Sequence, residues 1–389
     1  MFIKRKKEGY VMNPKNEKKI QIIVLTICLA IFGGLFVIAN IVYEPQDERV
    51  GLYYDRGQVV GIIHEVTEDP DDQGIFLYQL LEVRMLSGEF RGATFEVNNN
   101  LMSHRLRAFD AGDRVIVELT DNFIQVFAPD RSTSLLAAVG IFLVLLCLIG
   151  GKRGILAMGG LLFSLAAIVF VLVPLTLAGI AAIPIALLIS ILIIIVSTVL
   201  LAGVNSKSLA AILGCITGVL IAALFAFLVG HFAFISGYHT EQAGSLIWIL
   251  DDVSLSGIFI SGLIIAATGA IADTSMTIAS AMAEIKQANP AISLAKLRQA
   301  GLNVGRDVMG TMSNTLILAF VGSGFSLILF ITSLNVSWIE FINNDSIGIE
   351  VIQGIAGSIG IVLTVPITTF ITAKLLSYNL HKNKSSGQQ

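Results

Sequence analysis

The sequence is poor in charged residues. Of its 389 residues, 14% are charged and 55% are hydrophobic, and the mean hydropathy is +0.82. A soluble protein of this length carries about 25% charged residues. The composition therefore excludes an ordinary soluble protein and indicates an integral membrane protein surrounded by a lipid bilayer.

The sequence also has few of the residues that build catalytic and metal sites. It contains three cysteines, each in a separate apolar run, and five scattered histidines, so we expect no disulfide framework and no metal site. The phosphate-binding motif G-x-x-x-x-G-K-[ST] is absent, which argues against a protein driven by its own ATP hydrolysis. We expect no cofactor and no catalytic residue, and hence no enzyme.

Long hydrophobic runs, by contrast, are abundant. A transmembrane helix needs about 20 apolar residues, and eight such spans are predicted. They lie at 20–43, 133–149, 155–175, 180–203, 209–233, 256–278, 309–333 and 347–373. The apolar core of the first span exceeds the roughly 7–15 residues of a signal peptide, so we interpret it as an uncleaved anchor.

Basic residues are distributed unevenly along the chain. Residues 44–131 contain arginines but no lysine. The basic residues outside this region fall at 1–19, in the loops at 150–154, 207 and 279–308, and in the tail from Lys374. Because basic loops stay in the cytoplasm, we predict a multi-pass protein of the cell membrane with both termini cytoplasmic. The predicted domains are a tail (1–19), an anchor (20–43), an extracytoplasmic domain (44–131), a seven-helix bundle (132–373) and a second tail (374–389).

The 44–131 region has a different character from the rest. Runs rich in β-branched and aromatic residues, such as "GQVVGIIHEV" and "DRVIVELTDNFIQVF", are separated by turn sequences such as "SGEFRG" and "DAGD". This pattern predicts a small all-β barrel of OB-like type with five or six strands. The region is acidic and lacks aromatic–basic clusters, so we do not expect it to bind nucleic acid. A structural or partner-docking role is the simpler interpretation.

One carboxylate lies clearly inside a predicted span. Asp273 follows a long uncharged run and opens the polar stretch "ADTSMTIASAMAE". The residues that recur around it at steps of three and four are Gly262, Ala266, Gly269, Asp273, Thr277, Ser280 and Glu284. They therefore share one helix face, small in its outer half and polar in its inner half.

The next predicted span carries a second polar face. In "GLNVGRDVMGTMSNT", the residues Asn303, Asp307, Gly310 and Asn314 recur at helical spacing, and Arg306 lies beside them. We expect the two faces to meet in the inner leaflet, with Arg306 opposite Asp273. The intervening residues 284–301 are predicted to be a cytoplasmic loop with a short amphipathic helix. The candidate ion or substrate site consists of Asp273, Thr277, Ser280, Glu284, Asn303, Arg306, Asp307 and Asn314.

Ionisable residues inside a membrane usually mark ion, proton or substrate paths. We therefore favour a secondary transporter or permease-like protein for a small solute or ion. A structural pair of Asp273 and Arg306 is an open alternative, and so is a non-transporting scaffold or sensor whose outer domain binds a partner. A remote alternative is an intramembrane aspartyl protease built on Asp273 and Asp307, although the Tyr-Asp and Gly-x-Gly-Asp contexts of those proteases are absent.

The fifth span has small residues at every fourth position. The ladder begins with Ala210, Gly214, Gly218 and Ala222. Small side chains let helices approach closely, so the ladder predicts tight packing within the bundle. A seam between two copies of the chain stays open as an alternative.

Two long blocks, "GAIADTSMTIASAMAEIKQANPAIS" and "GLNVGRDVMGTMSNTLILAFVGS", resemble the YibE/F-like multi-pass membrane proteins. The shorter runs "SGEFRGATFEVNN" and "GDRVIVEL" extend the resemblance into the outer domain. The pattern is close around Gly269, Asp273, Ser280, Glu284, Gly305, Arg306, Asp307, Asn314 and Thr315. The resemblance implies the multi-pass architecture, but it implies no reaction, substrate or ligand residue.

Overall fold

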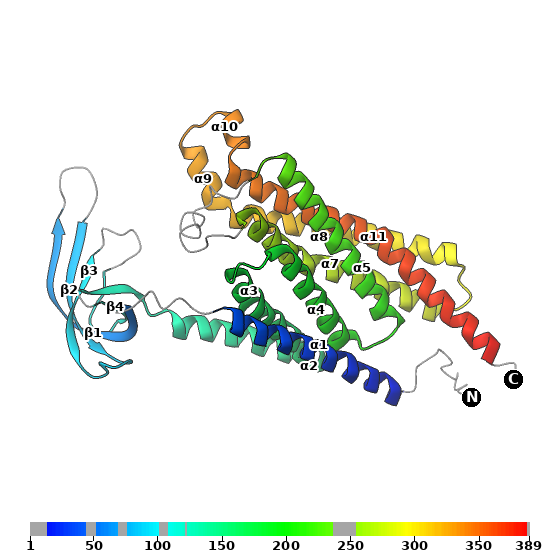
Figure 1. The fold of residues 1–389 in the computed structure, drawn as a ribbon, viewed down its shortest axis with the longest axis horizontal. Coiled ribbons are helices and arrows are strands. Elements are labelled where there is room, and N and C mark those ends of the chain that lie inside the picture. The colour runs from blue at the N-terminus through cyan, green and yellow to red at the C-terminus, as the bar shows by residue number, and fades with distance from the viewer. Residues whose placement is uncertain are drawn as a thin grey trace. The chain divides into compact units, whose positions relative to one another are not determined.

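The structure is a computed structural model that describes residues 14–43, 52–68, 76–100, 108–120, 123–235 and 254–386. The chain divides into two compact units, one made of Met1–Glu44 and Gly150–Gln389 and the other of Pro45–Ile149. The first unit is helical, and the second contains all the described strands (Figure 1). Most of the predicted N-terminal tail, 1–19, lies outside the described residues.

The second unit contains a closed five-stranded barrel. Its strands are β1 (Leu52–Glu68), β2 (Phe76–Met85), β3 (Thr94–Asn100), β4 (Arg114–Thr120) and β5 (Phe123–Pro129). Their order round the barrel is β1-β2-β3-β5-β4, and only β3 and β5 run parallel. β1 pairs with both β2 and β4, because it is long and register shifts near Val59 and Ile62 bend it. The predicted small β barrel is confirmed.

Alternating apolar residues fill this barrel. On β4, Val115, Val117 and Leu119 are buried while the residues between them are less so, as expected when successive side chains point to opposite faces of a strand. Gly57 of β1 packs so closely that a Cβ atom there would overlap Cγ1 of Val83. The alternation that predicted the strands therefore also builds the barrel core.

Asp130 fixes the point at which the chain leaves the barrel and enters α2 (Ser132–Ala167). Its carboxylate accepts hydrogen bonds from the Ser132 hydroxyl and, at 3.0 Å, from the Ser132 backbone N–H, while Nε of Arg56 lies 3.7 Å away. The hydrogen bond from the Ser132 hydroxyl, aided by the Arg56 charge, holds the pKa of the Asp130 carboxyl below its ordinary value. The carboxylate is thus ionised at neutral pH and satisfies a backbone donor at the start of the helix.

The helical unit is built mainly from long apolar helices. They are α1 (Pro14–Val42), the remainder of α2, η1 (Ile168–Leu172), α3 (Val173–Leu177), α4 (Ala182–Ala202), α5 (Ser206–Phe232), α7 (Leu255–Ala288), α8 (Leu294–Ser323), α9 (Phe325–Ser333), α10 (Trp338–Ile342) and α11 (Asp345–Ser386). Side-chain caps mark several helix starts. Asn205 forms a capping box with Ser208 before α5, and Ser254 and Ser293 accept backbone N–H bonds at the starts of α7 and α8.

Six of the described helical segments are long and apolar enough to cross a membrane, or up to seven if the bent pair α8–α9 is one span. The predicted number was eight. The difference lies in Ser132–Leu177, one stretch of 46 residues that would be about 69 Å long, more than twice the thickness of a bilayer core. This stretch breaks at Gly151 (φ +52°, ψ −132°), within the predicted loop 150–154. The count of eight stays a prediction.

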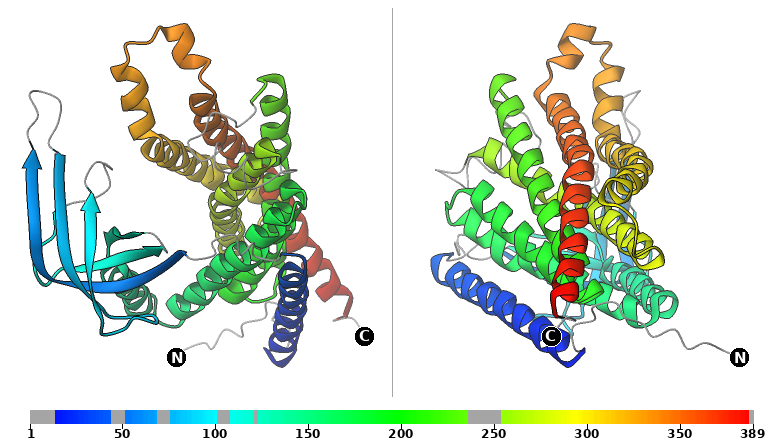
Figure 2. Two further views of the ribbon diagram at one scale, coloured as in Figure 1. Left: turned by 60° about the vertical axis from the view of Figure 1, so that its left-hand side comes forward. Right: turned by 90° about the vertical axis from the view of Figure 1, so that its right-hand side faces the viewer.

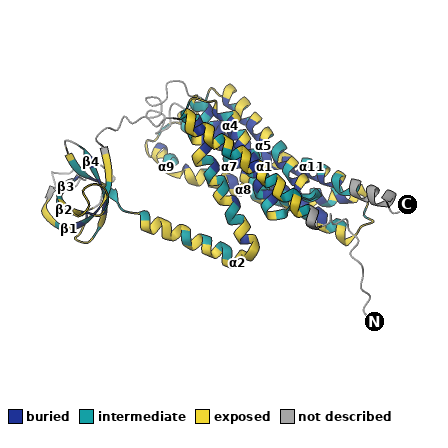
Figure 3. Cartoon of the chain, turned by 60° about the horizontal axis from the view of Figure 1, so that its bottom comes forward, coloured by how far each residue is buried: buried dark blue, intermediate teal, exposed yellow. Residues whose placement is uncertain are grey.

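The helical core is organised around α11. This helix packs on α5, α7 and α8, and the right-hand view of Figure 2 shows it running between α5 and α8. Buried residues gather along the sides on which these helices face one another (Figure 3). By contrast, no residue from Ser132 to Arg153 in α2 is buried.

The helices α7 and α8 form a long antiparallel hairpin. The predicted cytoplasmic loop at 284–301 is wrong in extent, because α7 continues to Ala288 and α8 begins at Leu294. The connection is short and held by hydrogen bonds, including one of 3.1 Å from Nζ of Lys286 to the carbonyl oxygen of Ile292. The residues counted as an amphipathic loop helix are the first turns of α8.

Candidate functional site

The predicted polar stripe of α7 lies on the outward side of that helix. Asp273, Thr277 and Glu284 are exposed and Ser280 is half-buried, as the spacing of three and four residues requires for one shared face. Met282 follows Asp273 by nine residues, about two and a half helical turns, and is fully buried. The stripe therefore points away from the side on which α7 packs.

The predicted polar face of α8 is also outward. Asn303, Arg306, Asp307 and Asn314 are all exposed, while Leu316, nine residues after Asp307, is buried. The exposed residues form local contacts, such as the 3.1 Å hydrogen bond from Nε2 of Gln299 to Oδ1 of Asn303. The spacing thus identified the shared face correctly, and the structure turns that face away from the helix core.

The structure does not bring the two polar faces together. α8 reaches α7 through its glycines: a Cβ atom at Gly305 would lie 3.2 Å from Cδ1 of Ile278, on the side of α7 away from Asp273. Among the described residues, no ion pair joins Asp273 to Arg306, and no hydrogen bond joins Asp273 to Asp307.

A different polar cluster is buried where α5, α7, α8 and α11 cross. We call it the hydroxyl seam, and it consists of Ser275, Thr364, Thr368, Thr369 and Thr372, all of which are fully buried. The hydroxyl of Thr368 donates to that of Ser275 at 3.4 Å. The hydroxyls of Thr364, Thr369 and Thr372 have no hydrogen-bond partner within the described part of the chain.

Glycines allow the helices to close around the seam. A Cβ atom at Gly214 or Gly218 of α5 would overlap the hydroxyl oxygen of Thr368 or Thr364, respectively. Ala210 and Ala222, which flank these glycines in the predicted ladder, are fully buried. The ladder therefore packs inside the chain, against α11.

A proline, Pro366, lies inside α11 in the same region, between Thr364 and Thr368. It has no N–H group, so the carbonyl of Val362 one turn earlier loses its usual helical partner. Hydroxyl oxygens are thus concentrated where α5, α7, α8 and α11 cross, beside a carbonyl oxygen that the proline leaves without its helical partner, and such groups can bind water or a cation.

A second buried polar group lies where α8 meets α9. The two helices are bent by 54° at Gly324, and a Cβ atom at this glycine would lie 3.2 Å from Cγ of Glu350 on α11. Oε2 of Glu350 is buried and has no partner among the residues that the structure describes. The carboxylate borders a cavity of about 300 Å³ with otherwise apolar walls.

Sequence reasoning missed Glu350 because it singled out Asp273 as the one acid clearly inside a span. The predicted last span begins at 347 and places Glu350 at its edge, where an acid usually reaches solvent. A signal was present in the spacing, since Glu350, Gly354 and Ser358 recur at every fourth residue and share a face of α11.

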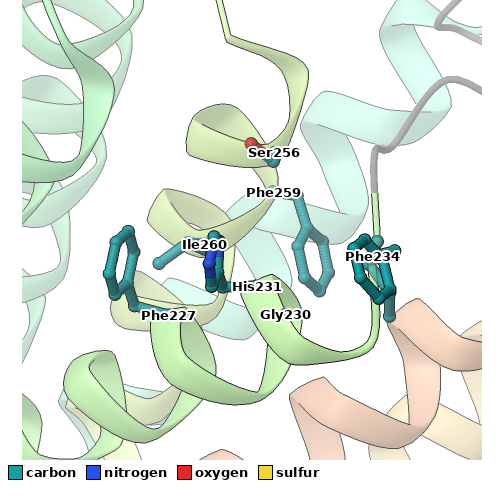
Figure 4. Close-up of a pocket in the computed structure, with 8 residues that line it drawn as sticks. Phe227, Gly230, His231, Phe234, Ser256, Phe259 and Ile260 are labelled. Atoms are coloured by element: carbon teal, nitrogen blue, oxygen red, sulfur yellow. The ribbon is translucent and has the colours of Figure 1, made fainter.

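Aromatic rings line another cavity, of about 220 Å³, between the end of α5 and the start of α7. Figure 4 shows the rings of Phe227, His231, Phe259 and Phe234 following one another across it. Phe227 and His231 stack with an interplanar angle of 11°. The lining contains no carboxylate or basic Lys/Arg side chain, so we assign no ligand to this cavity.

The described part of the chain offers no metal site. No group of three or more His, Cys, Asp or Glu side chains in the described ranges is arranged to hold a metal ion. No disulfide bond joins Cys28, Cys147 or Cys215.

Comparison with known proteins finds one family. The profile described as "YibE/F-like protein" matches residues 138–378, which is more than half of the chain. The matched region covers the helices from α2 to α11 but not the barrel. No curated protein and no solved structure matches the chain.

Proposed function

The chain belongs to the YibE/F-like protein family, and we propose that it is a secondary transporter or permease-like protein for a small solute or ion. The hydroxyl seam carries this proposal, because three of its hydroxyls are buried without a partner in the described structure. Each such hydroxyl costs about 1–3 kcal/mol of stability. A polar pathway through apolar helices needs oxygen atoms of this kind, whereas a passive anchor does not.

The shapes of two helices support the proposal. Pro366 interrupts the hydrogen bonding of α11 at the seam, and α8–α9 is broken at Gly324. Interrupted helices that free backbone groups near polar side chains are a recurrent way to build solute and ion sites in secondary transporters. In this proposal the chain moves its solute without converting it chemically.

We retain Asp273 as the coupling residue. Its carboxylate forms no ion pair with Arg306 of the same chain, so it can bind and release a proton or a cation. Arg306 and Asp307 would then set the local charge at the cytoplasmic half of α8, and Asn314 would add an uncharged amide, rather than complete a closed site with Asp273.

Transport in liposomes tests this function. Purified protein is reconstituted in liposomes that contain a pH-sensitive dye, and an imposed pH gradient is allowed to collapse. We expect Asp273→Asn to reduce the protein-dependent proton flux at least about tenfold, because an amide cannot carry the proton. Glu340→Gln, which removes a carboxylate from the exposed helix α10, should retain the flux. Equal flux in wild-type and empty liposomes would exclude a pathway that conducts protons through the protein without a co-transported solute.

A non-transporting scaffold or sensor is the second candidate, and the separate folding unit at Pro45–Ile149 favours it. In that case the barrel binds a partner and the helices anchor it. Cells that lack the protein would be compared with cells that express a variant. In the scaffold case, deletion of residues 46–130 should abolish the difference that the wild-type protein makes to such cells, while Asp273→Asn should preserve it. If the protein is a transporter, Asp273→Asn should itself abolish that difference.

We propose that the protein lies in the cell membrane with eight spans and both termini in the cytoplasm. In Figure 1, α1 begins, α4 meets α5, α7 meets α8 and α11 ends at one end of the helical unit. Lys207 and Lys286 lie at those connections, which supports a cytoplasmic location for that end.

Cysteine labelling tests this orientation. In a background without the three native cysteines, Glu89→Cys in the barrel should react with a membrane-impermeant maleimide on intact cells. Lys152→Cys, beside the break at Gly151, should react only after the membrane is opened. Labelling of Lys152→Cys on intact cells would contradict the count of eight spans.

A further inference from the structure

The cavity beside Glu350 combines one carboxylate with apolar walls. Residues of α8, α9, α10 and α11 line it, and the bend at Gly324 opens it. Its volume is about 300 Å³, within the range of small-molecule sites. Two aromatic residues, Phe320 and Phe341, are part of the lining. The cavity is therefore shaped by the helix break and not by a surface loop.

Within the described residues, the Glu350 carboxylate has no counter-charge. No ion pair involves Glu350 within the described ranges, and its Oε2 atom is buried with no hydrogen-bond partner there. A carboxylate oxygen buried without a partner in an apolar surrounding is costly. A ligand that carried a positive charge into the cavity would remove this cost.

The lining restricts the class of ligand. A hard inorganic cation such as Ca²⁺ prefers six to eight oxygen ligands, and the cavity offers a single carboxylate side chain. An anion would be repelled by that carboxylate, and a neutral apolar molecule would leave it unpaired. An organic cation satisfies both features, since its charge meets Glu350 and its hydrocarbon body fills the apolar space. Phe320 and Phe341 can add cation–π attraction.

We propose that the cavity between α8, α9, α10 and α11 is a binding site for an organic ammonium ion of about 10–15 non-hydrogen atoms, with Glu350 as its charge partner. Gly324 keeps the site open, because a larger residue there would press against the Glu350 side chain. This proposal does not rest on the proposed transport function, so binding can be tested whether or not the protein transports a solute.

Binding of benzyltrimethylammonium to the full-length protein in detergent tests the site. The charge of this probe does not change with pH, so it needs an anionic partner. Binding is measured by isothermal titration calorimetry against detergent alone. We expect Glu350→Gln, which keeps the size and removes the charge, to weaken binding about tenfold or more.

Two further variants make the test specific. Glu340→Gln removes a carboxylate from α10 outside the cavity lining and should bind the probe as the wild type does. Gly354→Leu should abolish binding by filling the cavity, since a Cβ atom at Gly354 meets only Ile317, at ordinary contact distance. Size-exclusion chromatography confirms that each variant remains folded.

The remaining outcomes overturn the proposal. Equal affinity of Glu350→Gln and wild type would mean that the cavity binds apolar molecules such as a lipid chain and ignores charge. Equal binding of the probe and of neutral benzyl alcohol to the wild type would mean the same. Absence of binding above the detergent baseline would show that no such site exists.

Discussion

Replacing Gly218 by alanine is expected to destabilise the helical unit, although alanine is the better helix former. The added Cβ atom would overlap Oγ1 of Thr364 and lie 2.9 Å from Cγ2 of Ile271, and all three residues are buried. Overpacking of a close-packed core costs about 1–3 kcal/mol, which outweighs the roughly 1 kcal/mol that alanine gains over glycine in a helix. Thermal unfolding in detergent should show a lower midpoint than that of the wild type.

Gly230→Ala is the matched control for this prediction. Gly230 lies on the same helix, α5, and is also buried, but an added Cβ atom would meet nothing within 4 Å. Only the helix preference then remains, so the unfolding midpoint should stay the same or rise. If Gly218→Ala also unfolds at or above the wild-type midpoint, α5 and α11 do not cross at Gly218 as the structure places them.

The two units differ in how far their folds follow from sequence. The barrel was predictable because apolar and polar residues alternate along its strands. Side chains two residues apart lie on the same face of a strand, so Val115, Val117 and Leu119 point inward together. The α5 ladder was predictable for a similar reason, since only a packed neighbour explains glycine at positions 214 and 218. The pattern predicted close packing at these glycines, but only the structure shows that the packing partner is α11 of the same chain.

The direction of the polar faces did not follow from sequence. Helical spacing shows that Asp273 and Thr277 share a face, but a periodic pattern cannot tell which face packs when apolar residues cover both sides. In the structure, packing against residues far away in the sequence decides which face is buried. Gly301 and Gly305 of α8 fit against Thr369 and Val365 of α11. That fit buries the opposite sides of α7 and α8 and leaves their carboxylates outward.

The helix ends were difficult for another reason. Hydropathy locates the apolar middle of a helix but not where the helix stops, so α7 and α8 extend through the predicted loop. Glu350 was overlooked because hydropathy placed it at the margin of a span. Its position in a cavity depends on the 54° bend at Gly324, which brings α9 and α10 over the start of α11.

Replacing Thr369 by valine should separate stability from function. The Thr369 hydroxyl is fully buried and lacks a partner in the described structure, and valine has the same shape without the polar atom. Removing an unsatisfied polar group while keeping its shape is neutral or favourable. We therefore expect the thermal unfolding midpoint to rise, by an amount that corresponds to about 1 kcal/mol, while protein-dependent flux in liposomes falls.

Thr268→Val provides the comparison. Like Thr369, Thr268 is a buried threonine, but it lies on α7. Its hydroxyl donates a 2.6 Å hydrogen bond to the carbonyl oxygen of Ile264. Its loss should lower the midpoint by an amount that corresponds to about 0.6 kcal/mol, typical of hydrogen bonds in membrane helices, and flux should remain. A Thr369→Val protein that is more stable and equally active would show that the seam is a packing feature. More stability with less flux would mean that the unpaired hydroxyls are kept, at a cost in stability, for the passage of a polar solute.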